Sequence, residues 1–114
     1  MSVRRQSLIL IDSSVWIDYY HPKGPAVLKR KVQEELAQGT VATIGLIAVE
    51  VLQGAPNSTT LAALREDFLG YHWLEIVRDV WFEAARVGSS LRHTGVSIPT
   101  TDMVIAATAL HYHA

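Results

Sequence analysis

The chain contains no cysteine, and this absence excludes both a disulfide framework and a thiolate metal site. A thiol-free sequence suits a reducing compartment, so we expect a cytoplasmic protein. Long apolar runs are also missing, because the N-terminal run LILI ends at Asp12 after four residues. We therefore expect neither a cleaved signal peptide nor a membrane span.

An excess of charge of one sign is lacking as well. Ten basic and eleven acidic residues leave a formal net charge of −1, so no strong overall field attracts nucleic acid. Lys29–Lys31, together with Arg4 and Arg5, could contact RNA, although a solvated helix face is the simpler interpretation. Without a Walker-type glycine loop or a GxGxxG motif, nucleotide binding of those two kinds is disfavoured.

Apolar residues are plentiful, and they are distributed as in a folded domain. Hydrophobic residues make up 49% of the 114 positions and charged residues 18%, which argues against disorder. We find no repeat, linker or low-complexity segment. The sequence therefore predicts a single domain over residues 1–114, large enough to bury a core.

Short apolar stretches alternate with amphipathic ones along the chain, and this pattern predicts an α/β fold. Strands are predicted over Ser7–Ile11, Thr40–Ile44 and Trp73–Val77, the first of them buried on both faces. Helices are predicted over Val15–Tyr20 with Ser13 or Ser14 as cap, Ala26–Gln38 closed by Gly39, Gly45–Gln53, a segment opened by Asn57 or Ser58, and Asp79–Leu91 with Asp79 as cap. The stretch Ser97–Tyr112 is predicted to form the last helix, which is entered through Pro99 and Thr100. We expect a parallel sheet with helices on both faces.

Two of these helices have predicted buried faces that the structure can test. In Ala26–Gln38 the residues expected to face inward are Val27, Leu28, Val32 and Leu36. In the last helix they are Met103, Ile105, Ala106 and Leu110. The small alanines of the last helix would also let its backbone lie close against a sheet.

Asp12, Glu50 and Asp102 are each the only charged residue in a long uncharged segment, and none has Lys or Arg at i±3 or i±4. An ionised carboxylate among apolar residues is costly unless it is paired, hydrogen-bonded or bound to a metal. Asp12 at a strand end and Asp102 at a helix start fall on the carboxyl edge of the predicted sheet. Glu50 would reach back to that edge from its helix. We predict that the fold gathers the three acids around a cation.

Carboxylates with no cysteine and no well-spaced histidine make a hard-oxygen site, which suits Mg²⁺ or Mn²⁺. Such ions activate water and stabilise the displacement at a phosphodiester. A phospho-aspartyl phosphatase would need a second acid where Ser14 stands, which argues against that class. Taken singly, each acid has a simpler interpretation: a turn residue for Asp12, a partly exposed helix position for Glu50, and a dipole-favoured helix start for Asp102.

The segments LILIDSSVWIDYY, AVEVLQG and PTTDMVIAATAL resemble, in order and spacing, the motifs of PIN-domain ribonucleases, especially the VapC toxins of bacterial toxin–antitoxin pairs. The resemblance implies that Asp12, Glu50 and Asp102 bind the metal of an Mg²⁺- or Mn²⁺-dependent endoribonuclease. It also implies that a hydroxyl at Ser13 or Ser14 helps to order that site. An RNA substrate, a cognate antitoxin and a homodimer are implied in the same way. The alternative is a non-catalytic PIN-like binding module that acts through an antitoxin complex or a dimer.

The family pattern extends beyond the Asp102 helix to a strand ending in a fourth acid, a helix and a final strand. The sequence stops at Ala114, so we expect a C-terminally shortened domain that lacks this strand-helix-strand, with the first strand unpaired at one edge.

Aromatic residues near the predicted site suggest where a partner binds. We expect the helices Val15–Tyr20 and Ala26–Gln38, with Trp16, Tyr19 and Tyr20, to form a groove for an antitoxin segment. Together with Trp73 and Trp81, Trp16 is expected to be a core or dimer-interface residue. A platform for stacking RNA bases is the less favoured interpretation.

Overall fold

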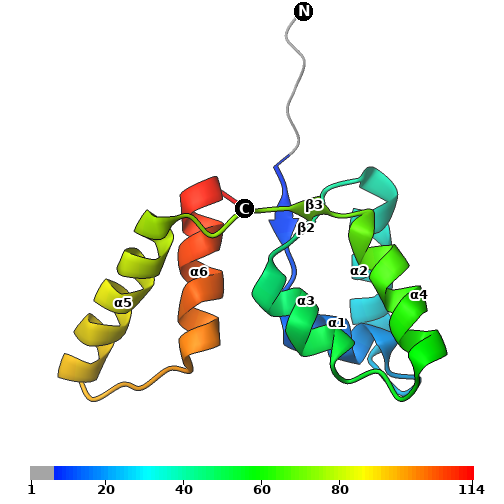
Figure 1. Ribbon diagram of the computed structural model, residues 1–114, viewed down its shortest axis with the longest axis horizontal. Coiled ribbons are helices and arrows are strands. Elements are labelled where there is room, and N and C mark those ends of the chain that lie inside the picture. The colour runs from blue at the N-terminus through cyan, green and yellow to red at the C-terminus, as the bar shows by residue number, and fades with distance from the viewer. Residues whose placement is uncertain (1–6) are drawn as a thin grey trace, which may run out of the picture. The chain divides into compact units, whose positions relative to one another are not determined.

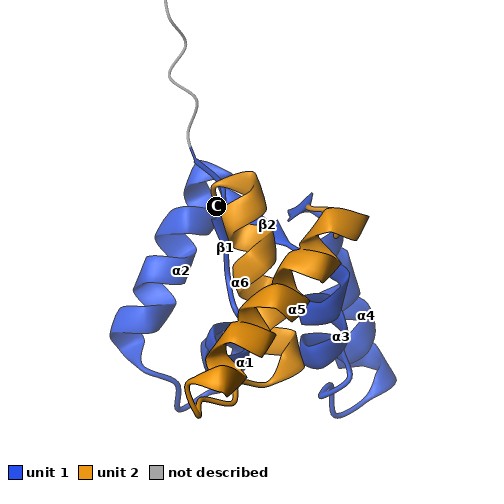
Figure 2. Ribbon diagram, turned by 90° about the vertical axis from the view of Figure 1, so that its left-hand side faces the viewer, with its two compact units in different colours: residues 1–73 blue, residues 74–114 orange. Residues whose placement is uncertain are grey.

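The computed structural model describes residues 7–114, which form two compact units divided after Trp73 (Figures 1 and 2). Unit 1 contains β1 (Ile9–Leu10), α1 (Ser13–Tyr20), α2 (Ala26–Gln38), β2 (Val41–Thr43), α3 (Gly45–Leu52), α4 (Ser58–Leu69) and β3 (His72–Trp73). Unit 2 contains α5 (Arg78–His93) and α6 (Thr100–Tyr112). The predicted basic residues Arg4 and Arg5 lie outside the described part of the chain.

A parallel sheet with strand order β1-β2-β3 organises unit 1. Its register pairs Ile9 with Val41, Leu10 with Ala42, Ala42 with His72, and Thr43 with Trp73. All three residues of the central strand, β2, are buried. The predicted α/β class, with a parallel sheet and flanking helices, is confirmed.

The first strand was predicted to be buried on both faces, and this prediction is wrong. Ile9 is 37% exposed and Leu10 is partly exposed, because β1 is at an edge of the described sheet. The doubly buried position belongs to β2, where Val41 and Ala42 are buried. Within residues 7–114, β1 pairs with β2 alone, as expected for a first strand that is unpaired at one edge.

Helix ends in unit 1 follow local signals in the sequence. Gly39 ends α2 in the left-handed conformation with φ of 69°, as predicted. Asn57 caps α4 by accepting a hydrogen bond from the Thr60 N–H at 2.8 Å. The predicted serine cap of α1 is wrong, since Asp12 is the cap and accepts the N–H of Ser13. A carboxylate caps as well as a hydroxyl, so the acid takes the position next to the strand.

Two predictions near the start of α5 are also wrong. The third strand is His72–Trp73 rather than Trp73–Val77. The Trp73 indole N–H donates to the Phe68 carbonyl at 2.8 Å, which fixes this strand beside the end of α4. Asp79 is not the cap of α5, because Val77 takes that position. Asp79 lies in the first turn, where its charge complements the helix dipole.

Trp16 is fully buried and centres the aromatic core of unit 1, as predicted for a core residue. Its ring stacks on Tyr71 at 5.1 Å between centroids and contacts Phe68 at 5.3 Å. On α2, Val32 is buried, with Leu28 and Leu36 partly so. Val27, predicted to face inward, is 77% exposed because it lies about 100° around the helix from Leu28.

Unit 2 is a pair of packed helices. On α5 the buried residues Val80, Ala84 and Gly88 follow an i, i+4, i+8 stripe. The predicted buried face of α6 is correct only in part, because Met103 and Ile105 are partly buried while Ala106 and Leu110 are exposed. Its buried residues are Val104, Ala107 and Thr108, whereas Leu110 is 70% exposed. The Thr108 hydroxyl donates to the Val104 carbonyl at 2.7 Å, so this polar side chain is buried without an unmet hydrogen bond. Of the helices in residues 7–114, none is long and apolar enough to cross a membrane.

Candidate functional site

Asp12 stands where β1 ends and α1 begins, and its carboxylate is held by three hydrogen bonds. Oδ1 accepts the backbone N–H of Ser13 at 2.8 Å and its hydroxyl at 3.4 Å. Oδ2 accepts the Ser14 hydroxyl at 2.7 Å. A carboxylate has about four acceptor positions, so Oδ2 keeps capacity for a further ligand. The two serines thus orient the Asp12 carboxylate and leave it able to accept a further ligand.

Glu50 lies in the second turn of α3, which begins directly after β2. Its Oε1 is buried and accepts no hydrogen bond from the described residues. A buried carboxylate oxygen with no partner is costly, which makes this atom a candidate ligand for a cation. Helix α3 packs against α1, and both helices start at the carboxyl ends of neighbouring parallel strands. Asp12 and Glu50 therefore belong to adjacent elements of one sheet edge.

A hollow of about 560 Å³ opens beside Glu50, between α1, α3 and α4. Glu50 is the one carboxylate among the side chains lining it, and the walls are otherwise mainly apolar. Ile17 contributes from α1 and is 52% exposed. The groove predicted over α1 and α2 is correct in part. Tyr19 and Tyr20 of α1 and Leu36 of α2 line a separate hollow of about 310 Å³, whereas Trp16 is fully buried and offers no surface. Tyr20 lines the hollow beside Glu50 as well.

Asp102 belongs to unit 2. It is exposed in the first turn of α6, where a carboxylate is favoured by the helix dipole. Asp12 and Glu50 belong to unit 1, so the convergence of the three acids stays a prediction. Within the described part of either unit, no three His, Asp or Glu side chains are grouped so that they could hold a metal ion.

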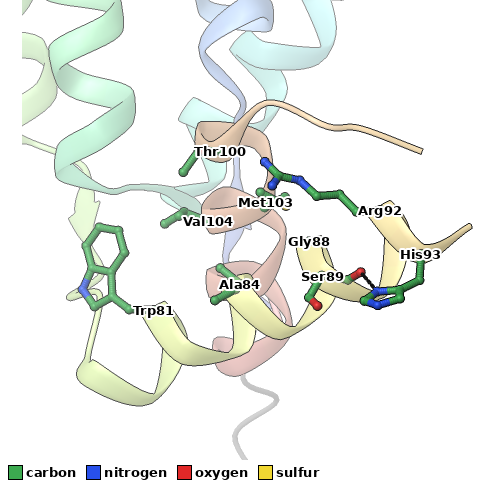
Figure 3. A pocket seen from close by; sticks show the side chains of 10 residues that line it. Trp81, Ala84, Gly88, Ser89, Arg92, His93, Thr100, Met103 and Val104 are labelled. Atoms are coloured by element: carbon green, nitrogen blue, oxygen red, sulfur yellow. Dashed lines mark hydrogen bonds between the residues drawn. The ribbon is translucent and has the colours of Figure 1, made fainter. Parts of the chain in front are cut away.

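Sequence reasoning missed a groove of about 400 Å³ in unit 2, between α5 and α6 (Figure 3). Trp81, predicted for the core or a dimer interface, lines this groove and is 47% exposed. Arg92 lines it from the other end of α5. The eleven-residue spacing of these two residues places them on one helix face, a signal the sequence does contain.

The comparisons with known proteins concern the segment that contains all three acids. No curated protein matches the chain. The family model described as the PIN domain matches residues 9–114, a range that includes Asp12, Glu50 and Asp102. PIN domains are generally nucleases, and they typically use divalent metals. The match covers nearly the full length of the sequence, and the chain therefore belongs to the PIN domain family.

Proposed function

We propose that the chain is a metal-dependent endoribonuclease of the VapC toxin type, neutralised by a cognate antitoxin. The observation that carries this proposal is the PIN domain match over residues 9–114. The three isolated acids of the sequence all lie within the matched range. Order and spacing of the segments around them support the narrower, VapC-type assignment.

The donor atoms of unit 1 fit a hard divalent cation such as Mg²⁺ or Mn²⁺. They are carboxylate oxygens, the type of ligand that these ions prefer. Oε1 of Glu50 has no hydrogen-bond partner, and Oδ2 of Asp12 has acceptor capacity left. Asp12 and Glu50 would hold the ion, with Asp102 as the third acid. Bound there, the ion would polarise a phosphodiester and lower the pKa of a bound water.

The surrounding residues have supporting roles in this proposal. The Ser13 and Ser14 hydroxyls fix the rotamer of Asp12, so that little reorganisation is needed when a cation binds. The buried side chains of Ile47 and Val51, on the same helix as Glu50, keep that helix anchored in the core. A rigid support of this kind holds ligands within the narrow geometry that metal catalysis requires.

Cleavage of a labelled single-stranded RNA by the purified chain, with Mg²⁺ or Mn²⁺ and with EDTA, tests the assignment. We expect metal-dependent cleavage that falls at least about hundredfold in Asp12→Asn, Glu50→Gln and Asp102→Asn, since even outer-shell partners of metal ligands cost up to that much. Asp18→Asn, on α1, and Asp79→Asn, in the first turn of α5, are matched controls that should cleave normally. Equal losses in the controls would contradict the assignment.

The hollow beside Glu50 is the surface that we propose for the antitoxin, with a basic antitoxin residue directed at the acid. Ile17→Asp should weaken a complex co-purified with the cognate antitoxin, whereas Val27→Asp, on the exposed side of α2, should not. Sedimentation of the purified chain tests the proposed homodimer. A chain that binds an antitoxin but never cleaves RNA would favour the alternative, a non-catalytic binding module.

A further inference from the structure

The groove between α5 and α6 combines features that the proposed catalytic acids do not explain. Its lining consists of Trp81, Ala84, Ala85, Gly88, Ser89, Arg92 and His93 from α5, with Thr100, Met103 and Val104 from α6. The α5 residues between Trp81 and Arg92 in this lining are small, and Met103 of α6 lies against Gly88. Figure 3 shows Trp81 at one end of α5, and Arg92 extending from the other end toward α6.

The two helices that form the groove approach closely at one glycine. A Cβ atom at Gly88 would lie 2.5 Å from Sδ of Met103 and 3.0 Å from its Cε. Trp81 and Arg92 lie about three turns apart along α5, or roughly 16 Å. An extended ligand can therefore contact the ring of Trp81 and the guanidinium of Arg92 at the same time.

Arg92 is the one Arg, Lys, Asp or Glu side chain that lines the groove. Arg92 and His93 line it, and no carboxylate does. Within residues 7–114 no acidic side chain forms an ion pair with Arg92, whereas Arg86 on the same helix is held by Glu83 at 2.6 Å. The hollow beside Glu50 has an acid in its wall instead. Charge complementarity thus favours an anionic occupant for the groove in unit 2.

The His93 ring adds a directed polar group. Its Nδ1 lies 2.7 Å from the Ser89 carbonyl oxygen, so Nδ1 carries the proton and donates it. This hydrogen bond fixes the ring, and in the neutral imidazole it leaves Nε2 as a hydrogen-bond acceptor for a ligand. The hydroxyls of Ser89 and Thr100 offer donors along the groove.

We propose that this groove binds a segment of single-stranded RNA, with a base stacked on Trp81 and a phosphate held by Arg92. A half-exposed indole and a guanidinium with no acidic partner among the described residues are the elements by which proteins bind single strands without reading their sequence. The inference rests on the proposed function in one respect: the strand bound here is the substrate of the nuclease. Asp102 supports that link, since it is on α6 between the lining residues Thr100 and Met103.

Binding of a fluorescein-labelled single-stranded RNA in EDTA, followed by anisotropy, tests the groove without any cleavage. Loss of one stacked base should weaken binding about tenfold or more in Trp81→Ala, and Trp81→Phe should restore most of it. Arg92→Ala should reduce the slope of log K against log salt by about 0.7, the value for one phosphate contact on a single strand. Circular dichroism establishes that each variant is folded.

The chain offers matched controls on the same helix. Phe82 is 69% exposed and does not line the groove, so Phe82→Ala should bind RNA like the wild type. Arg86 is paired with Glu83, and Arg86→Ala should leave the salt slope unchanged. Polyglutamate serves as the probe for an acidic polypeptide. Unchanged RNA affinity in both groove variants, or tighter binding of polyglutamate than of RNA, would overturn the proposal.

Failure of the groove and failure of the proposed function give different results. If the wild type cleaves RNA and Asp102→Asn does not, while Trp81→Ala has an unchanged KM, the nuclease assignment stands and the groove is refuted. If RNA binding in EDTA depends on Trp81 and Arg92 but no metal supports cleavage, the groove stands and the nuclease assignment fails. A raised KM with unchanged kcat in Trp81→Ala would support both.

Discussion

The hydroxyl oxygens of Tyr20 and Tyr71 lie 3.4 Å apart, and both rings stack on the buried indole of Trp16. Burial raises the pKa of both phenols. Their hydrogen bond raises the pKa of Tyr20 further and has the opposite effect on Tyr71, as expected if Tyr20 is the donor. The aromatic core of unit 1 therefore requires neutral tyrosines.

This pair predicts a loss of stability at alkaline pH. Both tyrosines are neutral in the folded and unfolded states below their ordinary pKa of 10.0, so the pair causes no pH dependence there. Above about pH 10 the unfolded chain loses these protons first, so the free energy of unfolding falls as pH rises. Urea unfolding followed by tryptophan fluorescence between about pH 8 and 11 measures this decline. Tyr20→Phe should make it shallower, whereas Tyr112→Phe, outside this core, should not.

Asp12 has two roles that separate substitutions can distinguish. As the cap of α1 it stabilises the fold, and as a proposed ligand it supports cleavage. Asp12→Ala should lose about 1 kcal/mol of unfolding free energy with the cap, while Asp12→Asn should lose only a few tenths. Both should abolish metal-dependent cleavage. A cleaving Asp12→Asn variant would show that the acid is needed only as a cap.

The Ser14 hydroxyl should matter for activity more than for stability. Ser14 is exposed, and its one described side-chain hydrogen bond is to Oδ2 of Asp12. Ser14→Ala should lower metal affinity or cleavage about 10- to 100-fold, as expected for a residue that orients a ligand. Ser58→Ala, at the start of α4, is the control and should have no effect on cleavage. Titration of cleavage with Mn²⁺ provides the readout, and unchanged metal dependence would refute the role.

Local signals predicted helices better than strands. Ala26–Gln38 is correct at both ends because Pro25 and Gly39 confine it, and Asn57 was one of two predicted starts for α4. The strand predictions relied on apolar runs, which do not distinguish a central strand from an edge strand. The face of α6 was predicted only in part, because Thr108 is buried with its hydroxyl bonded to its own helix, which hydrophobicity alone does not predict.

The candidate site was also predicted only in part. The three acids stand out in the sequence because each is alone in an uncharged segment, and the structure puts Asp12 at a strand end as predicted. Whether the acids meet depends on packing between distant segments, which no local pattern encodes. The groove lined by Trp81 and Arg92 was missed because the exposure of these side chains depends on how α6 packs against α5. Their position on one face of α5 follows from their spacing in the sequence alone.

Gly24 should tolerate no side chain. A Cβ atom there would lie 1.9 Å from the carbonyl oxygen of Asp18, a main-chain atom at the end of α1 that cannot turn aside. We expect Gly24→Ala to destabilise unit 1 by about 1–3 kcal/mol, the usual cost of forcing backbone shifts. Gly45→Ala is the control, because no atom lies within 4 Å of its added Cβ. Equal unfolding free energies for the two variants would contradict this account of the α1–α2 turn.

Gly88 should respond differently, because the atoms near its missing Cβ belong to the flexible end of Met103. In Gly88→Ala the thioether can move, and alanine is favoured over glycine in a helix by about 1 kcal/mol, so we expect almost no net change in stability. A leucine has no such space, and Gly88→Leu should cost about 1–3 kcal/mol by overpacking the contact between α5 and α6. Met103→Ala should recover part of that cost in the double variant, whereas Met103→Ala alone should destabilise. Chemical unfolding of the four proteins completes the double-mutant cycle, and an interaction energy near zero would show that the two helices do not meet at this glycine.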